Sequence, residues 1–260
     1  MSVTISSLES PFECPDFVYR NKPIRAAGQD ISTLPTYTIP EAAAFLAISP
    51  RTLFDWYAGP TPVLKASGEY SGRFSLLSFR DLEEAYKVHI LRSRDRLSLQ
   101  YLRKAMTEAR EDYATGHPLI DRARDLAVFF DKKKNKLVMS LPGRGRRPRR
   151  SIALASPETA AYIPEVVKTW GRRIVKDRRG RTQIFPWRFF KSDELSRPVT
   201  LDPEVMSGRL VVSGTRIPVS TLWKRKLAGE VPERIAEDYR IDADLVKKAL
   251  MHVDVHQKAA

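Results

Sequence analysis

The chain has 260 residues, of which 42% are hydrophobic and 29% charged, a composition typical of a folded protein. It contains no run of about 18 apolar residues and no secretory signal at its start, so we expect a cytoplasmic protein without a membrane span. Cys14 is the only cysteine, which excludes an internal disulfide and a multi-cysteine zinc site.

The net charge of +14 is concentrated in the middle of the chain. Residues 1–120 hold 14 basic and 14 acidic residues, residues 121–190 hold 19 and 6, and residues 191–260 hold 12 and 11. So basic a segment repels itself unless an anion lies nearby, and this favours a nucleic-acid partner. A solvated basic surface is the alternative interpretation.

Two short helices are predicted after a flexible Ser/Pro/Glu-rich arm at residues 1–34. Thr38 is a cap for the first helix, because Ser, Thr, Asp and Asn favour that position. Ser49 and the proline after it begin the second helix, Arg51 to Tyr57. Leu53 and Trp56, three residues apart, give the second helix its inward face. Two helices joined by a tight turn are typical of a helix-turn-helix.

The residues that follow fit a winged form of this motif. Two glycines flank Tyr70, and Arg73 lies beyond them, as expected for a β-hairpin wing. Ser78 and Asp81 have the spacing of a capping box at the start of a third helix. Ser98 begins a further helix.

The stretch from about Tyr37 to Ala109 resembles the MerR family of winged helix-turn-helix proteins, because YTI-x-EAA, SPRTL, the wing and SLQYLRKA occur in that order. The resemblance implies DNA contacts from Ser49, Arg51 and Thr52, and a phosphate contact from Arg73. The positions after Leu53 are Phe54 and Asp55, where basic residues are common. Because an aspartate is repelled by DNA, a helical protein-binding module remains the alternative.

The middle region is expected to hold strands at 128–130, 136–141 and 182–187, and a helix at 157–175. Its glycine- and proline-rich stretch resembles an AT-hook core, with one extra arginine before the proline. Arginines on extended backbone can enter a narrow minor groove or contact phosphates. A solvated loop is the alternative. The DNA-binding candidates in this stretch are Arg144, Arg146, Arg147, Arg149 and Arg150.

The last segment predicts an extended stretch, two glycine turns and three helices. Gly208 and Gly214 flank the strand-like RLVV, and both are expected to adopt positive φ. Pro218 favours a helix start, and Gly229 ends that helix. Two more helices follow at 231–239 and 243–253.

This segment closely resembles a small bacterial domain of formerly unknown function, whose signature here runs from Asp202 to Val219 and then from Gly229 to Tyr239. Proteins with it are similar to VapB-type antitoxins, whose partners are PIN-like ribonuclease toxins. The resemblance implies toxin neutralisation and operator binding. The toxin-binding candidates are Gly214, Thr215, Arg216, Pro218 and Trp223.

We expect no catalysis and no cofactor, because the sequence has no phosphate loop, nucleophile elbow or metal motif. The expected class is α+β: an arm (1–34), a MerR-like winged helix-turn-helix (35–118), a basic β-containing region (119–190) and a three-helix domain with a short β-hairpin (191–260). The leading hypothesis is an antitoxin that represses its own operon by binding operator DNA and that neutralises a PIN-like ribonuclease, as a homodimer or a higher toxin–antitoxin complex. The alternatives are a stand-alone MerR-like regulator and a module that sequesters a ribonuclease without binding DNA.

Overall fold

The protein is described from a computed structural model, which places residues 30–67, 76–93, 98–121, 127–131, 136–141, 150–155, 173–176, 181–186 and 196–257. In this part of the chain the fold is α+β, with many helices and small antiparallel sheets, as expected. The helices before the first strand are η1 (Ile31–Thr33), α2 (Ile39–Leu46), α3 (Pro50–Ala58), α4 (Phe79–Ser93), α5 (Leu99–Tyr113) and α6 (Pro118–Asp121). The end of the predicted arm therefore forms a turn of 3₁₀ helix, and Leu34 after it is buried.

The starts of α2 and α3 follow from their capping residues. The Thr38 hydroxyl accepts from the backbone N–H of Glu41, and the Glu41 carboxylate accepts from the backbone N–H of Thr38. Ala47 takes the left-handed conformation with φ 57° and ends α2, and Ser49 then caps α3. Leu53 and Trp56 are buried, as their spacing predicted.

The strands form three small antiparallel sheets. Their bounds are β1 (Ala127–Asp131), β2 (Lys136–Leu141), β3 (Arg150–Ala155), β4 (Ile174–Lys176), β5 (Thr182–Ile184), β6 (Val199–Thr200) and β7 (Val211–Val212). The sheets are β1-β2-β3, β4-β5 and β6-β7. Phe129 lies opposite Val138, and Met139 lies opposite Ile152.

Two features of the middle region differ from the sequence prediction. Strand β3 was not predicted, because the arginine-rich stretch before it was treated as one irregular segment. The helix predicted for 157–175 is wrong at its end, where Ile174 and Val175 pair with β5 instead. Their β-branched side chains suit a strand, and the pairing partner decides in its favour. Residues 157–172 of that predicted helix lie outside the described residues.

The C-terminal segment contains η3 (Met206–Gly208), α8 (Val219–Leu227), α9 (Pro232–Tyr239) and α10 (Ala243–Gln257). Gly208 and Gly214 have φ of 77° and 75°, as predicted for the two turns. The inner face of α8 is formed by the buried side chains of Val219, Leu222 and Trp223. It packs in the same core as Ile235 and Val246.

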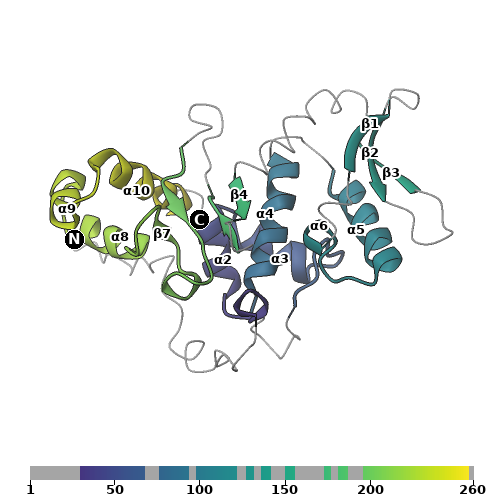
Figure 1. The fold of residues 1–260 in the computed structure, drawn as a ribbon, viewed down its shortest axis with the longest axis horizontal. Helices are drawn as coiled ribbons and strands as arrows, with labels where there is room; N and C mark the ends of the chain where they lie inside the picture. The colour runs from purple at the N-terminus through teal and green to yellow at the C-terminus, as the bar shows by residue number, and fades with distance from the viewer. Residues whose placement is uncertain are drawn as a thin grey trace, which may run out of the picture.

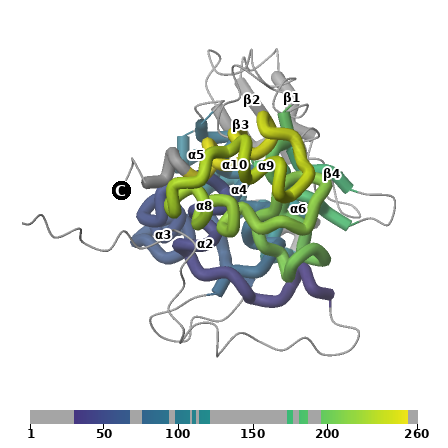
Figure 2. The backbone as a smooth tube through the Cα atoms, turned by 90° about the vertical axis from the view of Figure 1, so that its left-hand side faces the viewer, coloured from purple at the N-terminus to yellow at the C-terminus, as the bar shows by residue number. Residues whose placement is uncertain are grey.

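One hydrophobic core joins the N-terminal helices to the C-terminal segment. The Tyr37 hydroxyl donates to the carbonyl of Gly208 (3.1 Å), and His252 Nε2 donates to the carbonyl of Phe45 (3.0 Å). A bridge between Ile184 and Leu201 adds the β4-β5 hairpin to the same body. In Figure 1, α2 and α4 occupy the centre, α8–α10 lie at one end, and β1–β3 lie at the other beside α5. The view in Figure 2 looks onto the α8–α10 end.

Candidate nucleic-acid interface

Helix α3 presents three of the predicted DNA-contacting residues at its exposed first turn. The turn between α2 and α3 spans only Ala47 to Ser49, because the left-handed residue reverses the chain directly. The Ser49 hydroxyl accepts from the backbone N–H of Thr52 at 3.5 Å. Ser49, Arg51 and Thr52 are all exposed. Buried side chains on the other face of α3 fix this turn against the core.

Arg51 is paired with Asp55 one helical turn further on. The guanidinium Nε lies 3.1 Å from Asp55 Oδ2, and the Arg51 side chain is 79% exposed. The same guanidinium lies 5.9 Å from the centre of the Phe54 ring, which is itself 42% exposed. The pair compensates the carboxylate charge that the sequence predicted to repel DNA. It also fixes the orientation of the Arg51 side chain on the outer face of α3.

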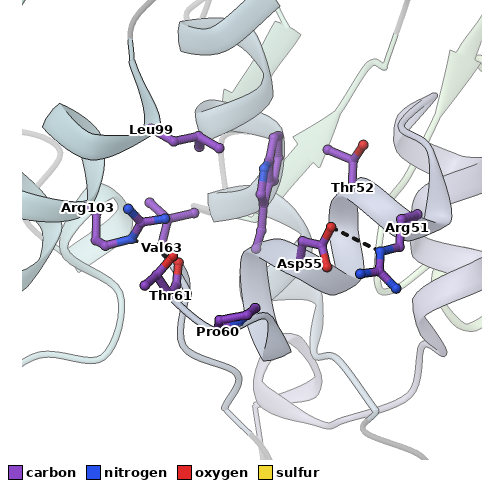
Figure 3. A pocket seen from close by; sticks show the side chains of 9 residues that line it. Arg51, Thr52, Asp55, Pro60, Thr61, Val63, Leu99 and Arg103 are labelled. Carbon is purple, nitrogen blue, oxygen red and sulfur yellow. Dashed lines mark hydrogen bonds and ion pairs between the residues drawn. The ribbon is translucent and has the colours of Figure 1, made fainter.

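A surface hollow of about 430 Å³ adjoins α3 on the side of α5 (Figure 3). It is lined by Arg51, Thr52, Asp55, Trp56, Pro60, Thr61, Val63, Leu99 and Arg103. Arg103 comes from α5, and its Nε donates to the carbonyl of Thr61 at 2.8 Å. Sequence reasoning missed Arg103, because only the fold brings the first turn of α5 beside α3.

The other predicted DNA-binding residues are not placed at this surface. Arg73, Arg144, Arg146, Arg147 and Arg149 lie outside the described residues. Arg150 is the first residue of β3, where its backbone lies opposite Leu141. The contacts predicted for these arginines stay predictions.

A buried polar network holds the start of α4 and was only partly predicted. Ser78 and Asp81 form the expected capping box, with both backbone N–H groups hydrogen-bonded. Asp81 also accepts from the backbone N–H and the hydroxyl of Ser67, both at 3.0 Å. Ser67 Oγ lies 2.9 Å from His117 Nε2, and His117 Nδ1 lies 3.1 Å from Glu84 Oε2.

The imidazole of His117 therefore lies between two carboxylates. Burial lowers the pKa of His117, but its hydrogen bond to Glu84 and the negative charges of Glu84 and Asp81 more than offset this. The pKa of His117 is raised above its ordinary value. A serine, a histidine and a carboxylate linked by hydrogen bonds can form a nucleophilic triad, yet the Ser67 hydroxyl here donates its hydrogen bond to Asp81. The imidazole is also stabilised in its protonated form. The cluster is therefore better suited to hold Ser67 and the start of α4 in place than to act as a general base.

In the C-terminal segment the toxin-binding candidates divide into exposed and buried groups. Gly214 and Arg216 are exposed in the turn between β7 and α8, and Pro218 is half-buried as the cap of α8. The Thr215 hydroxyl donates to the carbonyl of Val212 and accepts from the N–H of Ile217, so it builds the turn. Trp223 is only 3% exposed, and its ring is therefore not available for a surface contact in this conformation.

Arg225 on α8 contacts residues of the C-terminal signature on and before α9. Its guanidinium contacts the carboxylates of Glu230 and Asp238, and it lies 5.4 Å from the centre of the Tyr239 ring. The hydrogen bonds from Arg225 lower the pKa of Glu230 and of Asp238. Asp238 and Tyr239 of the signature therefore stabilise the packing of α9 against α8.

Within the described residues, no three histidine, cysteine or acidic side chains are grouped so as to hold a metal ion. Among the same residues, no helix has both the length and the apolar character needed to cross a membrane.

The fold and the α3 surface define an α+β protein in which the first turn of α3 is exposed and the C-terminal segment is helical. Residues 199–252 match the family model described as "Protein of unknown function (DUF433)". The chain is similar to the crystal structure of Rv2018 from Mycobacterium tuberculosis, with 20% identity and a TM-score of 0.54. That similarity covers 84% of this chain and 98% of the other, and at such identity it concerns the fold alone. No curated protein sequence matches the chain.

Proposed function

We propose that the protein is a DNA-binding antitoxin without catalytic activity, which represses its own operator and neutralises a PIN-like ribonuclease. The proposed DNA binding is supported by the first turn of α3. There, a short turn from α2 and a serine cap leave Arg51 and Thr52 exposed above a buried apolar face. Side chains at the start of a second helix reach base edges in helix-turn-helix proteins.

The MerR-like interpretation of the N-terminal helices belongs to this proposal. It is supported by the order α2, α3, α4, α5 and by capping at Thr38, Ser49 and Ser98, as the sequence motifs predicted. The predicted wing lies outside the described residues. A homodimer is proposed because palindromic operators match a two-fold protein.

The toxin-binding half rests on the C-terminal segment and its resemblance to VapB-type antitoxins. Residues 191–260 have nearly balanced charge, which suits a protein partner better than a phosphate backbone. Leu227 and Val231 are 57% and 56% exposed and lie at either end of the turn between α8 and α9. Exposed apolar side chains close together favour a protein contact.

A second candidate is a module that sequesters a ribonuclease without binding DNA. The ion pair between Arg51 and Asp55 favours it, because part of the arginine charge is already compensated on the surface that would face DNA. A stand-alone MerR-like regulator would bind DNA without a toxin partner.

DNA recognition is tested with the double variant Arg51→Ala/Thr52→Ala in the full chain. We expect its affinity for the DNA upstream of its own gene to fall at least tenfold, with a smaller loss for random duplex, because groove contacts give specificity. Lys65→Ala, which removes an exposed cation outside α3, is the control. An equal loss on both DNAs, or none, would exclude α3 as the sequence-reading element.

Toxin binding is tested by co-expression of the full chain with the product of the adjacent reading frame. Leu227→Ser is expected to reduce co-purification of that product, because it removes an exposed apolar side chain from the α8–α9 turn. Met251→Ser is the matched control, since Met251 is 47% exposed on α10 of the same segment. Equal capture by both variants would place the contact elsewhere.

A further inference from the structure

We propose that the hollow between α3 and α5 binds a phosphodiester group of duplex DNA, with Arg103 as its phosphate-binding residue. The inference rests on the proposed DNA-binding function and adds a ligand class, a second helix and a residue to it. It is carried by the arrangement of two guanidinium groups, two threonines and the start of α5 around one surface hollow.

Arg103 is held in place by the loop after α3. Its Nε donates to the carbonyl of Thr61 at 2.8 Å, and the side chain points towards Thr61 across the edge of the hollow (Figure 3). This bond uses one of the five N–H donors of the guanidinium. The terminal amino groups have no other partner within the described part of the chain. A fixed guanidinium with free terminal donors matches the geometry of a phosphate.

The opposite side of the hollow belongs to α3. Arg51 and Thr52 line that side, and the Arg51 side chain is directed towards Asp55 (Figure 3). An anion in the hollow would thus meet donors from both helices. A DNA strand that passes beside a recognition helix places its phosphates along the edge of the groove, where such flanking donors lie.

The start of α5 adds a third favourable contribution. Leu99, the first residue of this 15-residue helix, lines the hollow. The N-terminal end of a helix carries a partial positive charge, which favours an anion nearby. This contribution supplements the two arginines and would not define a site alone.

Asp55 is the one acidic residue of the lining, and Arg51 pairs with only one of its carboxylate oxygens, because Asp55 Oδ1 is buried without a hydrogen-bond partner among the described residues. Its Oδ2 is engaged by Arg51 at 3.1 Å, so two arginines and one aspartate leave a net positive lining. Pro60 and Leu99 give the hollow an apolar portion that a deoxyribose would cover. Free phosphate would leave that portion exposed to water, and we therefore assign the nucleic-acid backbone as the source of the phosphate.

The test uses full-length protein and random-sequence duplex DNA, so it does not require a known operator. Affinity is measured by fluorescence anisotropy between ~50 and ~200 mM salt, where log affinity falls by about 0.9 per neutralised phosphate. Arg103→Ala is expected to reduce that slope by about 0.9. Lys104→Ala is the matched control, because Lys104 is the next cation on α5, is exposed and does not line the hollow.

Two further variants separate charge from folding. Arg103→Gln removes the charge but keeps an N–H donor for the carbonyl of Thr61, and should behave as Arg103→Ala does. Arg103→Lys keeps the charge and should retain most of the slope. Addition of inorganic phosphate to wild type at constant ionic strength should not compete with the duplex; competition that is lost in Arg103→Gln would mean that the hollow takes free phosphate instead.

An Arg103→Gln slope equal to that of wild type, or to that of Lys104→Ala, would overturn the proposal. Absence of any duplex binding by wild type at low salt would also overturn it. The proposed function fails separately, when binding to upstream DNA is no tighter than to random duplex and the adjacent gene product is not captured. In that case an Arg103-dependent salt slope would still support the phosphate site.

Discussion

Gly208 lies where the C-terminal segment packs against Tyr37, and replacing it should destabilise the fold far more than replacing Gly214. Both glycines have φ near 75°, where an L-residue costs about 1–2 kcal/mol. A Cβ at Gly208 would lie 1.8 Å from the Tyr37 hydroxyl, whereas a Cβ at Gly214 would meet nothing within 4 Å. Tyr37 is 4% exposed, and burial raises its pKa, so its ring lies in the packed interior where it has little room to move away from a new Cβ.

The expected magnitudes follow from these contacts. Gly214→Ala should lower the free energy of unfolding by about 1–2 kcal/mol, through backbone strain alone. Gly208→Ala adds overpacking of about 1–3 kcal/mol and an unsatisfied buried hydroxyl of about 1–3 kcal/mol. The total loss at Gly208 is then about 3–8 kcal/mol. Urea unfolding followed by circular dichroism measures both variants, with the m-value as a check on the denatured state.

A double-mutant cycle isolates the contact with Tyr37. Tyr37→Phe in the wild-type chain should cost about 1 kcal/mol, for the lost hydrogen bond to the carbonyl of Gly208. In the Gly208→Ala background the same change should be neutral or stabilising, because it removes the closest clashing atom. Equal costs for Gly208→Ala and Gly214→Ala, or additive effects in the cycle, would refute the packing of the N-terminal helices against the C-terminal segment.

Two other predictions concern His117 and the arginine-rich stretch. Because the pKa of His117 is raised in the folded state by Glu84 and Asp81, against the effects of burial and of Arg80, its contribution to stability is complete below about pH 6.5. That contribution is lost as pH rises through the pKa of His117 in the folded state, so the free energy of unfolding of the wild type should fall over this range. In His117→Gln the fall should be smaller. Identical pH profiles of the two proteins in urea unfolding would contradict a stabilising role of His117 in the network around Asp81. Changing Arg144, Arg146, Arg147, Arg149 and Arg150 together to Ala should flatten the salt dependence of DNA binding by about 0.9 for each phosphate contact removed, and an unchanged slope would mean that these arginines are only solvated.

Local structure was predictable wherever a capping residue or a glycine turn fixed it. Thr38 and Ser49 located the starts of α2 and α3, and Gly208 and Gly214 located the turns around β7. The ion pair of Arg51 with Asp55 was also within reach, because residues four apart on a helix are neighbours. The charge of Asp55 alone predicts repulsion from DNA, and only its spacing from Arg51 reveals the ion pair.

Contacts between distant residues were not predictable from local patterns. The bond from Tyr37 to Gly208 spans 171 residues, and that from His252 to Phe45 spans 207. The same holds for His117, which lies 36 positions from Asp81 in the sequence. It adds a contact to the predicted capping box of Ser78 and Asp81. Trp223, a predicted partner contact, lies buried on the inward face of α8. Arg103 became part of the candidate site only because α5 folds back beside α3.

Neutralisation of a ribonuclease is tested directly by one titration. The product of the adjacent reading frame is purified, and its cleavage of RNA is followed while the full-length protein is added. We expect inhibition that is complete near a fixed stoichiometric ratio, with Leu227→Ser requiring more protein than Met251→Ser. Undiminished cleavage at a large excess of the wild-type protein would contradict the antitoxin function.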